Sequence, residues 1–249
     1  MTVRSLSLVL GYALTASVML ATGPVWAQSM SLDLGDGPSA TGRIVQIIAL
    51  ITVLSLAPSI LVMVTSFTRI VVVLSFLRNA LGVQQTPPNA VLISLALFLT
   101  AFVMAPTLEQ SYKAGIAPLL ANEINEEEAF SRSVKPVHGF MMSHVREQDL
   151  KLFMDISKAP PTETAEKTPL RSLIRAFMIS ELRRAFEIGF LIFVPFLVID
   201  MVVASVLMSM GMMMLPPIMI SLPFKLIFFV LVDGWYLVAG SLIRSYGGG

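Results

Sequence analysis

The sequence contains no cysteine and only two histidines, His138 and His144. Without cysteine there are no disulfides, no thiolate metal ligands and no cysteine nucleophile. The histidines are six residues apart, which places them on different faces of a helix and does not suit a shared metal site. Glycine-rich phosphate loops, nucleophile elbows and paired catalytic carboxylates are also missing. We therefore expect neither an enzyme nor a bound metal or cofactor.

Charged residues are scarce as well. They make up 13% of the chain, whereas hydrophobic residues make up 55%. Soluble domains contain roughly a quarter charged residues, so this composition is typical of a membrane protein. The net charge of +1 gives no electrostatic reason to expect a nucleic-acid partner.

The N-terminus has the pattern of a secretory signal peptide. Arg4 gives it a positive start, Leu6–Ala21 is an apolar core, and residues suited to a cleavage site follow. The pattern predicts removal of residues 1–27 by cleavage after Ala27, which leaves Gln28 as the first residue of the mature chain. An uncleaved signal anchor is the alternative.

Apolar and polar stretches alternate in the rest of the chain. The apolar segments are Ile44–Val64, Ala90–Ala105, Ile188–Met210 and Ile218–Ile243. A membrane-spanning helix needs about 20 apolar residues. We therefore expect an all-α, membrane-associated fold of two long, kinked apolar helical hairpins with a mostly helical polar periplasmic region between them. The predicted parts after the signal are a linker (28–43), the first hairpin (44–106), the polar region (107–187) and the second hairpin (188–249).

The charges beside the first apolar segment predict how the chain is oriented. The connection after this segment contains Arg69 and Arg78. By the positive-inside rule it lies in the cytoplasm, as an exported N-terminus also requires. The polar region then lies in the periplasm, and the C-terminus returns to that side.

Helices are also expected in the polar region. The acidic stretch at 122–130 suits a helix N-terminus, and a break is expected near Gln148–Asp149. A flexible linker covers Ala159–Thr168. After it, apolar residues at 3–4 spacing from Leu170 predict a helix that continues into the third apolar segment. Arg183 with Glu187, and Glu181 with Arg184, are expected on a charged face of this helix.

Three charges and three prolines interrupt the apolar segments. The prolines are Pro58, Pro195 and Pro223, and the charges are Asp200, Lys225 and Asp233. A charge at the centre of a membrane helix costs about 2.5–3.5 kcal/mol on insertion scales. Such residues are tolerated where helices pack in protein or line a watery cavity. We expect buried charges that stabilise helix contacts during assembly, and a proton or ion relay is the alternative.

The stretch GMMMLPP joins the last two apolar segments. Gly211 gives the backbone freedom, and Pro216 and Pro217 disfavour helical geometry for the residues before them. Met212, Met213 and Met214 should therefore lie in a loop or a loosened helix end. Methionine side chains adapt to irregular surfaces, so a ring of them could seal a pore. The alternative is that they simply pack in lipid or in a protein core.

Two blocks of the sequence resemble one known family. TSFTRIVVVLSFLRNALGVQQTPPNAVLISLALFLTAFVMAP (65–106) resembles the first hallmark block of the FliP family of flagellar and type III secretion proteins. FMISELRRAFEIGFLIFVPFLVIDMVVASVLMSMGMMMLPPIMISLPFKLIFFVLVDGW (177–235) is similar to its second block nearly residue for residue. Together they cover about 100 positions.

The resemblance implies a non-enzymatic, pore-forming subunit of an export gate in the bacterial inner membrane, at the flagellar basal body. It implies a homo-oligomer of five copies with FliQ and FliR, with FlhB and FlhA nearby, through which unfolded flagellar axial proteins pass. Met212, Met213 and Met214 would be the gasket of this pore. The equivalent subunit of a virulence-type injectisome is one alternative. A small-solute or ion transporter with Asp200, Lys225 and Asp233 at the midplane is another, although no inverted repeat is visible.

Overall fold

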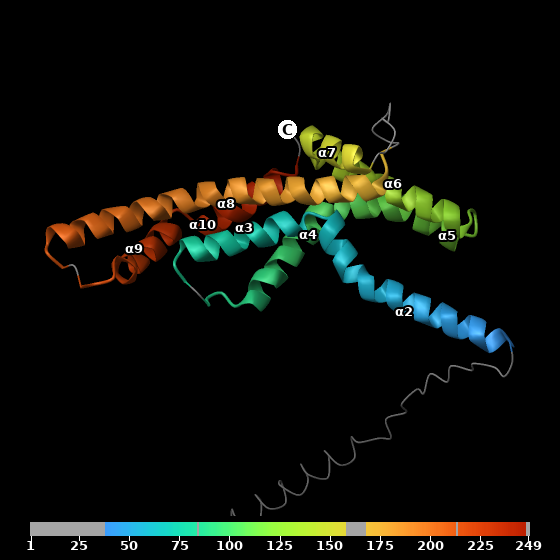
Figure 1. Ribbon diagram of the computed structural model, residues 1–249, viewed down its shortest axis with the longest axis horizontal. Coiled ribbons are helices and arrows are strands. Elements are labelled where there is room, and N and C mark those ends of the chain that lie inside the picture. The colour runs from blue at the N-terminus through green and yellow to red at the C-terminus, as the bar shows by residue number, and fades with distance from the viewer. Residues whose placement is uncertain (1–37, 84, 158–167, 213, 248–249) are drawn as a thin grey trace, which may run out of the picture. The chain divides into compact units, whose positions relative to one another are not determined.

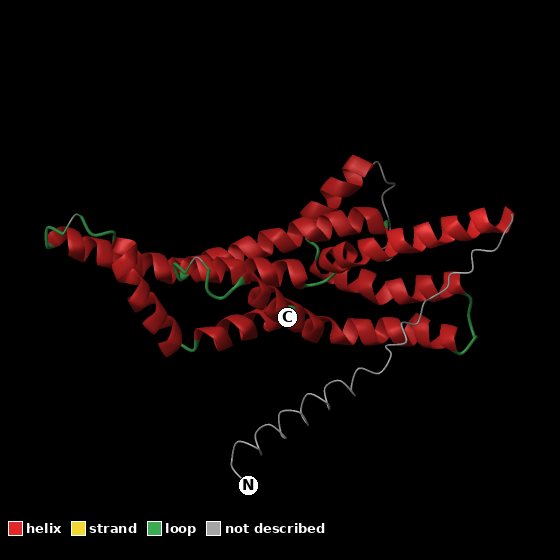
Figure 2. Ribbon diagram, turned by 90° about the horizontal axis from the view of Figure 1, so that it is seen from below, coloured by secondary structure: helices red, strands yellow, loops and turns green. Residues whose placement is uncertain are grey.

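The computed structural model describes residues 38–83, 85–157, 168–212 and 214–247. Within these ranges every regular element is a helix, which confirms the all-α expectation (Figure 2). The predicted signal peptide with Ala27 and Gln28, and Met213, lie outside the described residues. The chain divides between Leu54 and Ser55 into two units, which we describe separately.

The boundary between the units falls inside α2 (Pro38–Val64), which begins six residues before the predicted Ile44. Its stretch Ile47–Val64 is long and apolar enough to cross a membrane. Pro58 lies inside this helix, as expected. None of the described side chains of this stretch is buried.

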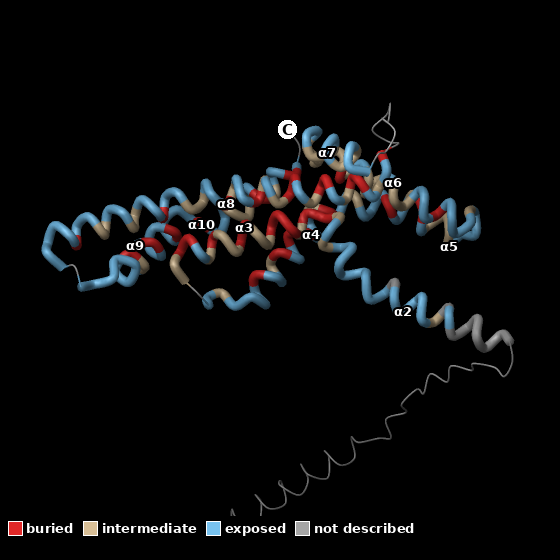
Figure 3. Tube along the Cα trace, in the orientation of Figure 1, coloured by how far each residue is buried: buried red, intermediate tan, exposed pale blue. Residues whose placement is uncertain are grey.

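The stretch after α2 corrects the sequence interpretation. We expected only a charged connection there, but α3 (Phe67–Ala80) is a helix with a buried apolar face. The cytoplasmic side of the membrane for this stretch stays a prediction. Its residues Ile70, Val73, Leu74 and Leu77 are buried and form one stripe, and α3 lies along α8 (Figures 1 and 3). This spacing is that of an amphipathic helix with its apolar face in the core. Arg69 lies in the same buried helix and is therefore not a loop charge.

The second apolar segment continues further than its composition indicated. α4 (Asn89–Ser111) passes through a single π-helical turn, η1 (Tyr112–Ile116), into α5 (Ala117–Leu120). Gly115 in this turn lies against α6, where an added Cβ atom would come within 2.3 Å of the Ala129 carbonyl oxygen. The absence of a side chain at Gly115 thus permits the close crossing of η1 and α6.

The described part of the polar region is helical, as predicted, and most of the predicted linker (159–168) lies outside the described residues. α6 (Glu126–His144) starts at the expected acidic stretch, where the Asn125 side chain accepts a 2.8 Å hydrogen bond from the Glu128 backbone N–H. This is an N-cap that satisfies an otherwise unpaired donor. α7 (Glu147–Ser157) follows a break at residues 145–146, slightly before the predicted position.

The longest helix, α8 (Leu170–Ser209), has 40 residues. At 1.5 Å per residue it is about 60 Å long, and it joins the polar region to the third apolar segment without a break, as predicted. Leu173 and Phe177 on its first half are fully buried. Arg183 and Glu187 form the expected ion pair, with 2.9 Å between Nε and Oε1.

The fourth apolar segment is broken. α9 (Pro217–Leu231) and α10 (Gly234–Arg244) are bent by 63° at a short break between them. Three helical stretches in the described part of the chain could cross a membrane by length and composition, or four if this bent pair counts as one span.

Candidate functional site: the α8–α9 hairpin and two ion pairs

A glycine, Gly211, ends helix α8. Gly211 has φ of +75°, in the left-handed region, and its N–H donates to the Met208 carbonyl oxygen at 3.1 Å. The Met212 N–H reaches the Leu207 carbonyl oxygen at 3.0 Å. This pair of hydrogen bonds is a Schellman motif, which satisfies the last carbonyl groups of a helix and ends it. The predicted role of Gly211 in loop geometry thus has a specific structural basis.

The methionine loop is short and open. Met214 is 98% exposed in the single chain and Met212 is 36% exposed. Pro216 precedes α9, and Pro217 is its first residue, where the missing N–H and fixed φ of proline are well suited. The described part of the loop therefore projects its methionines away from the chain's own core.

Asp200 and Lys225 form an ion pair between α8 and α9. The distance from Lys225 Nζ to Asp200 Oδ2 is 2.7 Å, and Ser221 Oγ donates to Asp200 Oδ1 at 2.6 Å. Lys225 Nζ also donates to the Ala80 carbonyl oxygen at the end of α3, at 3.2 Å. The sequence did not indicate which charges are partners, and the structure brings two of the three predicted charges together. Lys225 is 3% exposed, whereas the Asp200 side chain is 34% exposed.

Asp233 stands apart from this pair. It is exposed in the single chain and has φ of 50°, a left-handed conformation that non-glycine residues seldom adopt. Asp233 lies at the break between α9 and α10, where the chain bends from one helix into the next. The single chain does not bury Asp233, so its burial on assembly stays a prediction.

A second ion pair, between Arg69 and Glu181, was missed by the sequence interpretation. Arg69 is 1% exposed and Glu181 is fully buried. Arg69 Nε donates to Glu181 Oε2 at 2.9 Å and its Nη2 to Oε1, a two-pronged arrangement. We expected Glu181 and Arg184 together on a charged face of α8, but Glu181 is buried and pairs with Arg69 instead. The signal was present, because Glu181 lies four residues after Phe177 on the apolar stripe of α8.

The C-terminus closes this buried cluster. The Tyr246 hydroxyl donates to Glu181, and the Arg69 guanidinium carbon lies 3.9 Å from the centroid of the Tyr246 ring. Arg69 Nη1 also donates to Ser245 Oγ at 3.0 Å. Burial raises the pKa of the Tyr246 phenol, and the Glu181 carboxylate adds to this effect. Tyr246 therefore stays protonated and able to donate.

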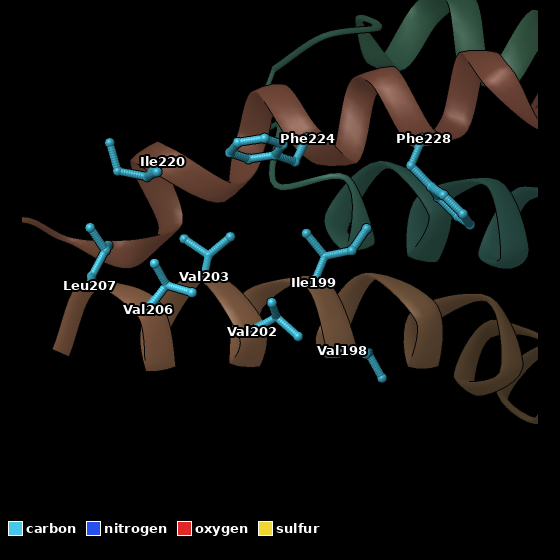
Figure 4. A pocket seen from close by; sticks show the side chains of 9 residues that line it. All are labelled: Val198, Ile199, Val202, Val203, Val206, Leu207, Ile220, Phe224 and Phe228. Atoms are coloured by element: carbon cyan, nitrogen blue, oxygen red, sulfur yellow. The ribbon is translucent and has the colours of Figure 1, made fainter. Parts of the chain in front are cut away.

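An apolar groove lies between α8 and α9 near the hairpin tip, with a volume of about 540 Å³ (Figure 4). Its lining is Val198, Ile199, Val202, Val203, Val206, Leu207, Ile220, Phe224 and Phe228. None of the three residues of the Asp200–Lys225–Ser221 cluster lines it. The hairpin thus has one purely apolar groove and, separately, one ionic contact.

The histidines do not form a metal site. His138 Nε2 lies 3.1 Å from the Thr168 carbonyl oxygen, and His144 Nδ1 lies 2.8 Å from that of Phe140. Among the described residues no group of three or more histidine or acidic side chains could hold a metal ion.

Comparison with known proteins gives the family. A family model described as "FliP family" matches residues 50–242. This chain belongs to the FliP family. The flagellar biosynthetic protein FliP of Caulobacter vibrioides is 64% identical over 93% of this chain and 88% of its own length. The flagellar biosynthetic protein FliP of Bacillus subtilis is 55% identical over 84% of this chain and 95% of its own length. That of Rhizobium meliloti is 51% identical over 92% of this chain and 96% of its own length. The matched residues include both ion pairs and the whole methionine loop, whereas Ser245 and Tyr246, which contact the Arg69–Glu181 pair, lie beyond the match.

Proposed function

We propose that the chain is a pore-forming structural subunit of the flagellar protein-export gate in the bacterial inner membrane. The family membership and the flagellar relatives support this assignment over an injectisome subunit. The observation that carries the pore role is the methionine loop, which ends α8 by a glycine motif and leaves Met214 98% exposed. Several copies around one axis would bring such loops together into an adaptable seal.

Exposed apolar side chains support assembly into a larger complex. Along α8, Phe190 is 67% exposed, Leu191 68% and Met201 64%. Large exposed apolar surfaces mark interaction or membrane sites in proteins. In the proposed gate these faces contact sister copies, FliQ and FliR, with FlhB and FlhA nearby, while unfolded flagellar proteins pass along the axis. The role is structural, and no catalytic step is part of it.

The ion pair argues against a small-solute transporter. A transporter site at the midplane needs charges that can meet a substrate or ion. Lys225 instead is buried and already donates to Asp200 and to the Ala80 carbonyl oxygen. A chain with its own transport site should also behave as a monomer or dimer, whereas a gate subunit should purify as a larger ring with its partners.

Disulfide crosslinking tests this proposal, because the sequence has no cysteine to interfere. We expect Met214→Cys to form dimers between copies in native membranes under mild oxidation. The matched control is Val230→Cys, which is 75% exposed on α9 but away from the loop. Equal crosslinking of both variants, or none at position 214 in assembled complexes, would contradict a central ring of loops.

A further inference from the structure

Asp233 is a carboxylate without a cation in an apolar part of the chain. It lies between α9 and α10, which together are apolar enough to count as one broken membrane span. Asp233 is exposed, and so are its apolar neighbours Leu231 (79%) and Tyr236 (64%). Among the described residues, no basic side chain forms an ion pair with it. When such an apolar surface is covered, a charge within it is costly unless it is paired.

The bend at Asp233 does not depend on its carboxylate. The Asp233 N–H donates to the Val230 carbonyl oxygen at 3.1 Å, and the Asp233 carbonyl oxygen accepts from the Leu237 N–H at 3.1 Å. Gly234 lies against the Phe229 ring, where an added Cβ atom would come within 2.2 Å. The Asp233 side chain makes no capping hydrogen bond to α10. The carboxylate is therefore available to a group outside the chain.

Arg78 is a cation without a carboxylate. It lies in the last turn of α3, and its Nη1 donates to Asn89 Oδ1 and to a backbone carbonyl oxygen, both neutral. Its Nε is buried and has no acceptor among the described residues. The other two basic residues within 44–106 and 188–243 are Arg69 and Lys225, and each is paired with a carboxylate. Within these apolar stretches, Arg78 and Asp233 are thus the two opposite charges left unpaired.

The two charges lie at one level of the helix bundle. Leu77, next to Arg78, lines a cavity of about 250 Å³ together with Val232 and Gly234, which lie on either side of Asp233. In a closed ring each copy presents one face to a different face of its neighbour, and equivalent residues of all copies lie at the same height. A charge on one face of a copy can therefore meet an opposite charge of the same height on the next copy.

We propose that Asp233 of one copy forms an ion pair with Arg78 of the next copy in the assembled ring. The proposal rests on the proposed function, because it assumes several copies around one axis. Guanidinium and carboxylate groups match in charge and in planar geometry. The pair would neutralise both charges at the moment when assembly covers the apolar surface around Asp233. It would also fix the register between neighbouring copies, since apolar contacts alone are not directional.

Charge reversal in the full chain tests the proposal. The chain is co-expressed with its gate partners, and the yield of assembled complex per chain is measured. Arg78→Glu and Asp233→Arg should each lower this yield by about tenfold or more, and the double variant should recover most of it because each interface regains a pair. A double variant without recovery would overturn the proposal, as would single variants that assemble like the wild type. A wild-type chain that forms no multimer would contradict the proposed pore function as well.

Two further variants separate the charge of Asp233 from its place at the bend. Asparagine and glycine also adopt the left-handed conformation. Asp233→Asn and Asp233→Gly should therefore leave the melting temperature of the isolated chain close to that of the wild type while the yield of complex falls. Glu187→Gln, which breaks an exposed pair within one chain, is the control and should change neither. Equal complex yields with aspartate, asparagine and glycine at position 233 would show that the residue only shapes the bend, and the proposal would be wrong.

Discussion

Helix α8 carries two ion pairs that differ in how completely the chain encloses them. Near its start, Glu181 is fully buried with Arg69 and is capped by Tyr246. Toward its end, Asp200 leaves a third of its side chain exposed although Lys225 is buried. The surroundings differ in the same way, because buried residues concentrate on α3 and the first half of α8 (Figure 3). The first region is completed within one chain, and we infer that the second is completed by assembly.

Breaking the enclosed Arg69–Glu181 pair should lower the stability of the chain more than any other change. Glu181→Gln leaves the buried Arg69 charge without its partner, which typically costs about 3–5 kcal/mol. We expect a strongly lowered apparent melting temperature in detergent and little protein in membranes. Glu187→Gln on the same helix is the control and should change the melting temperature little, because its pair with Arg183 is exposed.

A double variant sharpens this prediction. Replacing both partners, with Arg69→Met and Glu181→Met, removes the unpaired charge and should recover much of the lost stability. No recovery would show that the hydrogen bonds of the cluster, more than its charge balance, hold the core.

Breaking the partly exposed Asp200–Lys225 pair should affect assembly more than folding. Lys225→Ala leaves Asp200 without its cation and the Ala80 carbonyl oxygen without a donor, a loss of about 1–3 kcal/mol for unsatisfied groups. We expect the chain to accumulate with a modestly lowered melting temperature but to assemble poorly, measured as the yield of complex per chain. Normal complex yield with lost export would contradict this and would favour a relay role.

A substitution that disturbs a close helix contact should lower the stability by an amount similar to that of Lys225→Ala, or less. In Gly115→Ala the new Cβ atom would meet the Ala129 backbone oxygen at 2.3 Å, so α6 must shift. Overpacking of this kind costs about 1–3 kcal/mol. Gly139→Ala on α6 has nothing within 4 Å and should be neutral or slightly stabilising. If both variants melt alike, the crossing of η1 and α6 is looser than described.

The smallest expected effect is a pH dependence at Tyr246. Because burial raises the pKa of this phenol in the folded chain, its contribution to stability is complete below the unfolded pKa of about 10. That contribution is lost as the pH rises above this value, since only the unfolded chain ionises readily. The melting temperature should therefore fall above pH 10 less steeply in Tyr246→Phe than in the wild type. Identical slopes would place Tyr246 outside the buried cluster.

Local patterns in the sequence were sufficient for several features. The acidic N-cap region of α6, the apolar stripe of α8 from Leu170 and the glycine end of α8 at Gly211 depend on neighbouring residues, and the structure bears them out. The long-range partners could not be read in this way. Arg69 and Glu181 are 112 residues apart, and each resembles an ordinary surface charge until its partner is known.

The same limit explains the error at α3. Hydropathy alone separates apolar runs from charged connections, and Arg69 and Arg78 made this stretch resemble a loop. Burial of Arg69 is possible because Glu181 neutralises its charge and Ser245 and Tyr246 surround it. The break at Asp233 was missed for a related reason, since a left-handed aspartate leaves no periodic signal in an apolar run.

Ion conductance across membranes that contain the assembled complex tests the central claim most directly. Replacing Met212, Met213 and Met214 with alanine should leave the complex assembled and make the membrane leaky to small ions. The matched control replaces Met201, Met208 and Met219, which are also exposed but lie on the helices. That control should stay tight. An assembled loop variant whose membranes remain as tight as the wild type would contradict the account, because the methionines would then only pack.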